Sequence, residues 1–349
     1  MSDGTHIQWT DASWNPVRAR RKDGLPNKAG GGHSCLRMSP GCSNCYAATI
    51  NKRLGTGLDY DVRGLAASEH YLDARALMAP LRARKPKRWF LSSMTDVFGE
   101  WVPDEWLDRI FAVMALSPQH TFQVLTKRSG RMREYLSEYM TERRVQEEAW
   151  NSGGARAGLV IEMRWPLPNV WLGVSVEDQE RADERIPELL ATPAAVRFIS
   201  AEPLLGPLDL HFGKTIVVVD RLTPDQVSEL RRRIEESYRG TAAAHTVMEF
   251  AKPARWELLL HWVIVGGESG TRARRCDVAW VRDIVRQCQA AGTAVFCKQL
   301  GAAAHDTTPG TSFSMMAWRH RKDRKGGNPD EWPADLRVRE FPVDAEVRG

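Results

Sequence analysis

The stretch Val196-Arg-Phe-Ile-Ser-Ala201 is an apolar run rich in β-branched and aromatic residues, and Glu202-Pro203 follows it directly. Such a run is typical of a buried strand. Similar runs recur, and helix-like sequence follows most of them: 89–93, 121–125, 170–174, 261–265 and 294–298. Because strands that alternate with helices form parallel βα units, the sequence predicts an α/β fold, a partial or full parallel (βα) barrel.

Polar residues directly follow these apolar runs. In a parallel barrel the strand ends carry the active site, because rigid strands aim the side chains of the loops. The alternative is that single residues, such as Glu202 and Glu268, cap helices or pair with arginine and lysine. Polar residues at six strand ends together favour a functional site. The candidate residues are Ser92, Ser93, Asp96, Lys127, Arg128, Ser175, Glu177, Glu202, Glu268, Lys298 and Gln299.

Three cysteines lie in His33-Ser-Cys35-Leu-Arg-Met-Ser-Pro-Gly-Cys42-Ser-Asn-Cys45-Tyr46. Thiolates with C-x6-C-x2-C spacing can converge on one soft metal centre, and three of them leave one position of an iron-sulfur cluster free for a small molecule. A Cys3His zinc site that uses His33 is the alternative. Since no second ligand pair follows at zinc-finger spacing, an iron-sulfur cluster is favoured.

The composition is that of a globular protein, with 42% hydrophobic and 27% charged residues in 349. The first residues have no basic and apolar signal pattern, and no apolar run approaches the roughly 18 residues of a membrane span. We therefore expect a cytoplasmic protein without disulfides. Cys276, Cys288 and Cys297 are expected to be ordinary buried thiols.

Basic residues gather in four short segments, although the net charge is only +5. Such clusters favour a polyanionic partner such as nucleic acid, or are simply solvated faces. Thirteen tryptophans are many for this length; most are expected in the core, and some could stack on bases. The four basic segments are residues 18–22, 82–88, 231–233 and 319–325.

We expect one domain over residues 1–349. A helix is predicted at residues 104–116, with Asp104 as its N-cap. Two segments look inserted, at about 137–164 and 211–257. The second has a strand-like run at 215–219 and a capping box, Thr223-Pro-Asp-Gln226, that begins a helix to about residue 238. A C-terminal extension covers about 302–349.

Six short motifs are distributed along the chain: residues 9–16 (Trp-Thr-Asp-Ala-Ser-Trp-Asn-Pro), 39–46 (Ser-Pro-Gly-Cys-Ser-Asn-Cys-Tyr), 94–98 (Met-Thr-Asp-Val-Phe), 173–177 (Gly-Val-Ser-Val-Glu), 202–206 (Glu-Pro-Leu-Leu-Gly) and 266–270 (Gly-Gly-Glu-Ser-Gly). With these motifs the chain resembles the radical S-adenosylmethionine superfamily, and within it a three-cysteine-motif family found in phages and bacteria. The resemblance spans nearly the whole chain, including the tail at 332–342.

The chain departs from the superfamily pattern in two places. Many members have C-x3-C-x2-C with an aromatic residue before the last cysteine, whereas here Asn44 precedes Cys45 and Tyr46 follows it. The usual Gly-Gly-Glu of the second strand end is replaced by Ser92-Ser-Met-Thr-Asp96. The run Thr95-Asp-Val-Phe98 is similar to an element of spore photoproduct lyase-like enzymes, which act on thymine in DNA.

The resemblance implies a radical enzyme. Cys35, Cys42 and Cys45 would hold a [4Fe-4S] cluster that cleaves S-adenosylmethionine to a 5′-deoxyadenosyl radical, with an electron donor such as flavodoxin or ferredoxin. Ser92, Ser93 or Asp96 would accept from the methionine amino group, and Lys127 or Arg128 would bind its carboxylate. Ser175 and Glu177 would bind ribose, whereas Glu202, Glu268 and Lys298 would face the substrate.

The expected substrate is a nucleic-acid base or nucleotide, with a thymine-type base in DNA favoured. Two alternatives stay open. One is a radical S-adenosylmethionine enzyme that acts on a peptide or small molecule. The other is a non-catalytic, zinc-stabilised nucleic-acid-binding protein.

Overall fold

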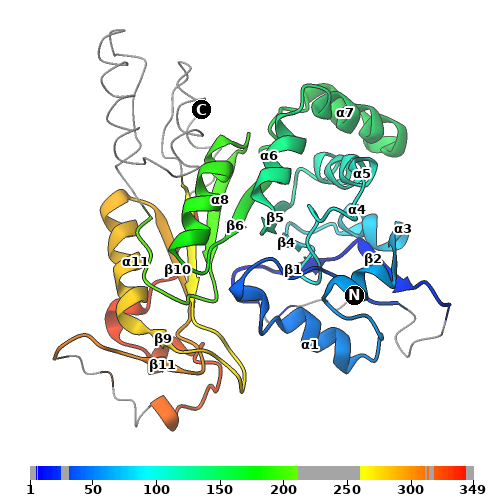
Figure 1. Cartoon of the computed structure of the whole chain (residues 1–349). Coiled ribbons are helices and arrows are strands. Elements are labelled where there is room, and N and C mark those ends of the chain that lie inside the picture. Colours follow the sequence, from blue (N-terminus) through cyan, green and yellow to red (C-terminus); the bar gives the residue numbers. More distant parts are fainter. Residues whose placement is uncertain are drawn as a thin grey trace, which may run out of the picture. The chain divides into compact units, whose positions relative to one another are not determined.

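The computed structural model describes residues 5, 7–24, 31–210, 260–310, 313 and 318–342. The chain forms two compact units (Figure 1). The first comprises Met1–Gly173 and Pro193–Val196, and the second comprises Val174–Thr192 and Arg197–Gly349. The predicted insertion at 211–257, with its strand and capped helix, lies outside the described residues, and the single-domain organisation stays a prediction.

Within the described residues, seven strands form a sheet in the order β1-β4-β5-β6-β7-β8-β10. The pairs β1–β4, β4–β5, β7–β8 and β8–β10 are parallel. The mixed α/β prediction is therefore confirmed, and the parallel sheet is consistent with a partial barrel. All six predicted runs are strands: β4 (Arg88–Leu91), β5 (Thr121–Thr126), β6 (Val170–Ser175), β7 (Val196–Ala201), β8 (Trp262–Gly266) and β10 (Ala294–Gln299).

The central strands are apolar on both faces. Every residue of β6 and β8 is buried. Strands covered on both faces form continuous runs of β-branched and aromatic residues rather than alternating patterns. The strand β1 (Ala12–Trp14), which was not predicted, joins the sheet beside β4.

In the first unit, helix α5 (Asp104–Ala115) packs against α7 (Thr141–Ser152) and α4 (Ala79–Arg82). The prediction of Asp104 as N-cap is wrong, because Pro103 is the N-cap and Asp104 lies in the first turn, where its carboxylate accepts from Arg131. The segment predicted as an insertion at 137–164 holds the last residue of α6 (Ser129–Ser137), then α7 and the 3₁₀ helix η2 (Gly154–Glu162). The short helix α3 (Ala74–Leu77) precedes α4.

The cysteine segment lies between the two strands of an antiparallel pair in the first unit, β2 (Val17–Arg21) and β3 (Ser68–Leu72). It contains a 3₁₀ turn, η1 (Pro40–Cys42), and is followed by α1 (Tyr46–Arg53) and α2 (Val62–Ala66). Gly32 begins the segment with a backbone bridge to Ala19.

In the second unit, α11 (Val278–Ala291) packs on β8 and β10, and α8 (Gln179–Ala191) follows β6 (Figure 1). Short strands β9 (Cys276–Asp277) and β11 (Ala304–His305) pair in parallel. The 3₁₀ helices η4 (Pro329–Glu331) and η5 (Ala334–Leu336) precede a tail that bridges to β10 between Arg339 and Phe296. Among the described helices, none is both long and apolar enough to cross a membrane.

Replacing Gly267 with alanine should destabilise the second unit. A Cβ at Gly267 would collide with the backbone carbonyl of Leu300, which follows β10 and cannot move without shifting the strand. We expect a loss of about 1–3 kcal/mol in the free energy of unfolding, measured by urea denaturation. Gly206→Ala is the matched control in the same unit, because a Cβ there meets no atom within 4 Å. Equal stability of the two variants would contradict this packing.

Candidate metal and cofactor site

The start of the cysteine segment is fixed by a buried hydrogen-bond network. The Asn51 side chain donates to the carbonyls of His33 (2.9 Å) and Leu58 (2.7 Å) and accepts from the His33 N–H (3.2 Å). The His33 ring contacts the Val17 carbonyl through Nδ1 at 3.1 Å. Burial lowers the pKa of His33 to about 4, so this ring is neutral at pH 7. A Cβ on Gly32 would lie 2.8 Å from the Thr56 methyl carbon, so this close approach requires glycine.

A second set of contacts ties the cysteine segment to the turn after β4. The Thr95 hydroxyl donates to the Ser34 carbonyl at 2.7 Å, and the Tyr46 hydroxyl donates to the Ser93 carbonyl at 2.5 Å. The Tyr60 hydroxyl donates to the Met94 carbonyl. The segment is therefore held on one side by a strand pair and on the other by a strand end of the sheet.

Cys35, Cys42 and Cys45 are free thiols, each partly exposed. Burial raises the pKa of Cys35 to about 12, and Asp96, Cys42 and Cys45 act on it in the same direction. Burial also raises the pKa of Cys45, opposed by the N–H groups of Ala48 and Ala47 at the start of α1. In the described part of the chain, no three or more His, Cys, Asp or Glu side chains are arranged as a ready-made metal site.

The Asp96 carboxylate is buried and accepts four hydrogen bonds. Oδ1 accepts from the Thr126 hydroxyl (2.7 Å) and the Phe98 N–H (3.1 Å), and Oδ2 accepts from the Lys127 N–H (3.0 Å) and Arg128 Nη1 (3.1 Å). A carboxylate offers about four acceptor positions. Asp96 therefore organises the ends of β4 and β5, with Arg128 as its counter-charge.

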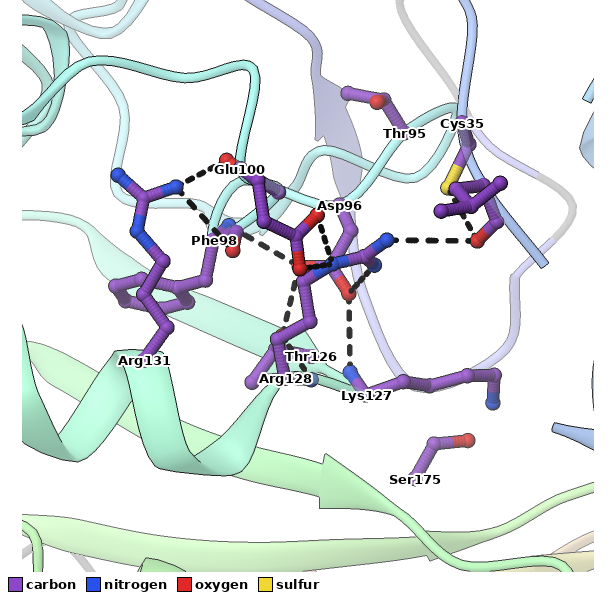
Figure 2. Close-up of polar contacts among 12 residues, drawn as sticks. Cys35, Thr95, Asp96, Phe98, Glu100, Thr126, Lys127, Arg128, Arg131 and Ser175 are labelled. Carbon is purple, nitrogen blue, oxygen red and sulfur yellow. Dashed lines mark hydrogen bonds and ion pairs between the residues drawn. The ribbon is translucent and has the colours of Figure 1, made fainter. Parts of the chain in front are cut away.

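Arg128 connects this carboxylate to the cysteine segment (Figure 2). Its Nε donates to both Glu100 oxygens at 3.1 Å, and Nη2 lies 3.5 Å from the Leu36 carbonyl oxygen, next to Cys35. The guanidinium lies 4.7 Å from the Trp101 ring centroid. Only 3% of the Arg128 side chain is exposed, so its charge is desolvated and fixed in place.

Ser92 has a strained backbone with φ of 54° at the end of β4. Its hydroxyl is buried and has no hydrogen-bond partner among the described residues. Strain and unpaired buried groups concentrate at functional sites, so Ser92 is a candidate ligand contact. Its neighbour Ser93 accepts a hydrogen bond from Asn15 at 3.1 Å. The Lys127 side chain points away from Asp96 in Figure 2, and its charge opposes the rise that burial causes in the pKa of Cys45.

The remaining predicted residues lie in the second unit. Glu177 is fully buried, and its Oε2 is 3.2 Å from Arg185 Nη1, which also donates to the Ser175 carbonyl at 2.7 Å. Glu268 accepts from Arg274 through the N–H (2.8 Å), Nε (3.0 Å) and Nη2 (2.7 Å). These two glutamates are thus paired with arginines.

Glu202 and Lys298 form a half-buried ion pair at the ends of β7 and β10. Lys298 Nζ lies 2.6 and 2.8 Å from the two Glu202 oxygens. Gln299 Nε2 donates to Glu202 Oε1 at 3.3 Å and to the Gly267 carbonyl at 2.8 Å. This cluster offers adjacent cationic, amide and carboxylate groups.

Several positioning residues were not predicted from the sequence. Asn51, Arg185 and Arg274 act through contacts that no local pattern reveals. Asn15 lies within the Trp9–Pro16 motif, so the sequence singled out this segment. It did not predict the contact that Asn15 makes, in which its Oδ1 accepts a hydrogen bond from the Met94 N–H at 3.0 Å.

The residues of the cysteine segment fit a thiolate-bound cluster. They supply three sulfur donors on one anchored loop, with backbone N–H groups directed at Cys45. Such hydrogen bonds tune iron-sulfur clusters. Thiols lose their protons when a metal binds, and metal binding is coupled to the ordering of its ligands.

The fold and site define a mixed α/β protein with a thiol-bearing loop beside a parallel sheet. The chain belongs to the family described as "Protein of unknown function (DUF5131)", whose family model matches residues 4–333. Comparisons with curated proteins and with solved structures gave no match.

Arg128→Gln should loosen the cysteine segment and destabilise the first unit. The substitution leaves Asp96 buried without its counter-charge, which costs about 3–5 kcal/mol in such pairs. We expect the backbone amides around Cys35 in the metal-free protein to exchange their hydrogens several-fold faster, as followed by hydrogen–deuterium exchange and mass spectrometry.

Arg144→Gln is the matched control. It removes an arginine that pairs with Asp108 at 3.0 Å in the same unit and whose other side-chain partners, Glu138 and Thr141, lie outside the cysteine segment. This variant should lose stability without a change in the exchange rate around Cys35. Equal acceleration of exchange in both variants would mean that general unfolding, rather than loss of the Arg128 link, exposes the backbone around Cys35.

Proposed function

We propose that the protein is a radical S-adenosylmethionine enzyme whose [4Fe-4S] cluster is held by Cys35, Cys42 and Cys45. The observation that carries the proposal is the anchored loop that presents three free, partly exposed thiols, Cys35, Cys42 and Cys45. When bound, such a cluster supplies the electron that cleaves S-adenosylmethionine to a 5′-deoxyadenosyl radical. A flavodoxin or ferredoxin is the proposed electron donor.

The surrounding residues of the first unit position this loop and its ligand. The unpaired Ser92 hydroxyl and the neighbouring Ser93 are the proposed acceptors for the methionine amino group, and Lys127 is the proposed partner of its carboxylate. Asp96 and Arg128 bind each other, so we assign them a positioning role: they fix the loop that carries Cys35.

The proposed substrate is a nucleic-acid base or nucleotide, with a thymine-type base in DNA favoured. Lys298 and Gln299 are donors beside the acceptor Glu202, and such a set matches the mixed donor and acceptor edge of a base. Glu268, which Arg274 holds in place, is a further proposed substrate contact. Ser175 remains the proposed ribose contact, whereas Glu177 is fully buried and paired with Arg185, so we assign it a supporting role.

The first test is the iron content of Cys42→Ser. Wild-type protein purified without oxygen should contain about four irons and four sulfides per chain, and Cys42→Ser should lose most of them. Elemental analysis and sulfide assay give the readout.

Cys288→Ser controls for the loss of a thiol, because Cys288 is a buried cysteine of α11 in the second unit. It should retain full iron and sulfide. A Cys42→Ser protein with wild-type iron would exclude Cys42 as a ligand, and one zinc without iron in the wild type would replace the cluster with a zinc site.

Glu202→Gln should separate substrate recognition from cofactor cleavage. The change keeps the side-chain shape but leaves Lys298 without its counter-charge, so oligonucleotide turnover should fall about tenfold or more. Release of 5′-deoxyadenosine without substrate should stay at the wild-type level. Glu180→Gln, at an exposed position of α8, is the control and should behave as wild type. Loss of cofactor cleavage in Glu202→Gln would contradict a substrate role.

A further inference from the structure

The loop at residues 318–327, named the basic loop here, directs its cations to solvent. Arg319, Lys322, Arg324 and Lys325 are exposed, and within the described residues none of them forms an ion pair. His320 is exposed beside them. Four free charges within seven residues make a concentrated positive surface.

Two acidic groups in and beside this loop, Asp323 and Glu331, bind its backbone instead. The Asp323 carboxylate accepts from the N–H groups of Lys325 (2.9 Å) and Gly327 (2.7 Å). Glu331 accepts from the N–H groups of Lys322 (2.5 Å) and Asp323 (3.3 Å). These carboxylates fix the backbone while the cationic side chains remain available.

The loop is also anchored from within. The Arg321 guanidinium donates to the Trp318 carbonyl (2.6 Å) and the Ala302 carbonyl (3.0 Å), and it lies 4.9 Å from the centroid of the buried Trp318 ring. Gly326 adopts φ of 71°, and a Cβ there would collide with Trp318. The cations are therefore presented on an ordered frame, which lowers the entropy cost of binding.

This frame is joined to the strand ends that carry the proposed substrate residues. The Leu300 N–H donates to the Gly326 carbonyl (2.9 Å), directly after Lys298 and Gln299 of β10. The Ala302 N–H donates to the Glu268 carbonyl (2.8 Å), which follows β8. Within the second unit, the basic loop thus flanks the ends of β8 and β10.

We propose that the basic loop binds the phosphate backbone of a nucleic-acid strand and delivers its base to the ends of β8 and β10. This inference rests on the nucleic-acid substrate proposed above. Lysine and arginine neutralise phosphates, while the neighbouring donors and acceptors, Lys298, Gln299 and Glu202, suit a base edge. An acidic peptide fits less well, because it would meet the carboxylates Glu202 and Glu268.

The test measures DNA binding by the full chain as a function of salt. The triple variant Lys322→Gln, Arg324→Gln, Lys325→Gln is compared with wild type by fluorescence anisotropy, on a mixed-sequence DNA duplex and its single strand. Each lost phosphate contact should reduce the slope of log Kobs against log salt by about 0.9 on the duplex or about 0.7 on the single strand. A larger loss on one probe identifies the form that is bound.

The matched control removes the same charge elsewhere. Arg63→Gln, Arg75→Gln, Arg143→Gln alters three exposed cations of the first unit that lie outside the basic clusters and form no ion pair in the described residues. Its slope should equal that of the wild type. Equal losses in both triple variants would overturn the proposal, because they would show an effect of net charge alone.

Two further outcomes would also overturn it. One is wild-type binding to neither DNA form, and the other is equally strong competition by polyglutamate at matched charge. Cofactor cleavage without nucleic acid should be unchanged in the basic-loop variant. The two proposals can therefore be refuted separately. If the basic loop does not bind DNA, iron content and cofactor cleavage can still support the radical enzyme. If the chain holds no iron but binds DNA through this loop, only the radical-enzyme function is refuted.

Discussion

The first unit depends on the buried ion pair between Asp96 and Arg128. Asp96 binds the ends of β4 and β5 together, and Arg128 extends that order to the cysteine segment through the Leu36 carbonyl. Both charges are largely desolvated, so each requires the other. This arrangement gives a loop of free thiols a fixed position beside a parallel sheet, without making the loop part of the sheet.

In the second unit, ion pairs also fix the side chains that follow the strands. Glu177 pairs with Arg185, Glu202 with Lys298 and Glu268 with Arg274. Their exposure differs, because the first pair is fully buried whereas the second is half-buried. The buried pair supports the fold, and the half-buried pair can exchange its internal contact for a ligand at lower cost.

The sequence predicted the sheet better than it predicted the site contacts. Six strands were evident because buried parallel strands are continuous apolar runs, whereas β1 has only three residues and β2 (Val-Arg-Ala-Arg-Arg) is too polar to resemble a strand. The sequence identified the polar residues that follow the strands, but not their partners. The pairing of Asp96 with Arg128 and of Glu268 with Arg274 depends on the tertiary structure. The N-cap at Pro103 shows that helix boundaries shift by a residue even where the helix itself is predicted.

We propose that the cysteine loop holds a redox-active cluster that binds S-adenosylmethionine. The most direct measurement is the electron paramagnetic resonance spectrum of the reduced, oxygen-free, full-length protein before and after S-adenosylmethionine is added. The account predicts a reduced [4Fe-4S] signal whose g values shift when the cofactor binds its free iron position. A cluster signal that is unchanged by the cofactor, or a protein that contains zinc and no iron, would contradict it.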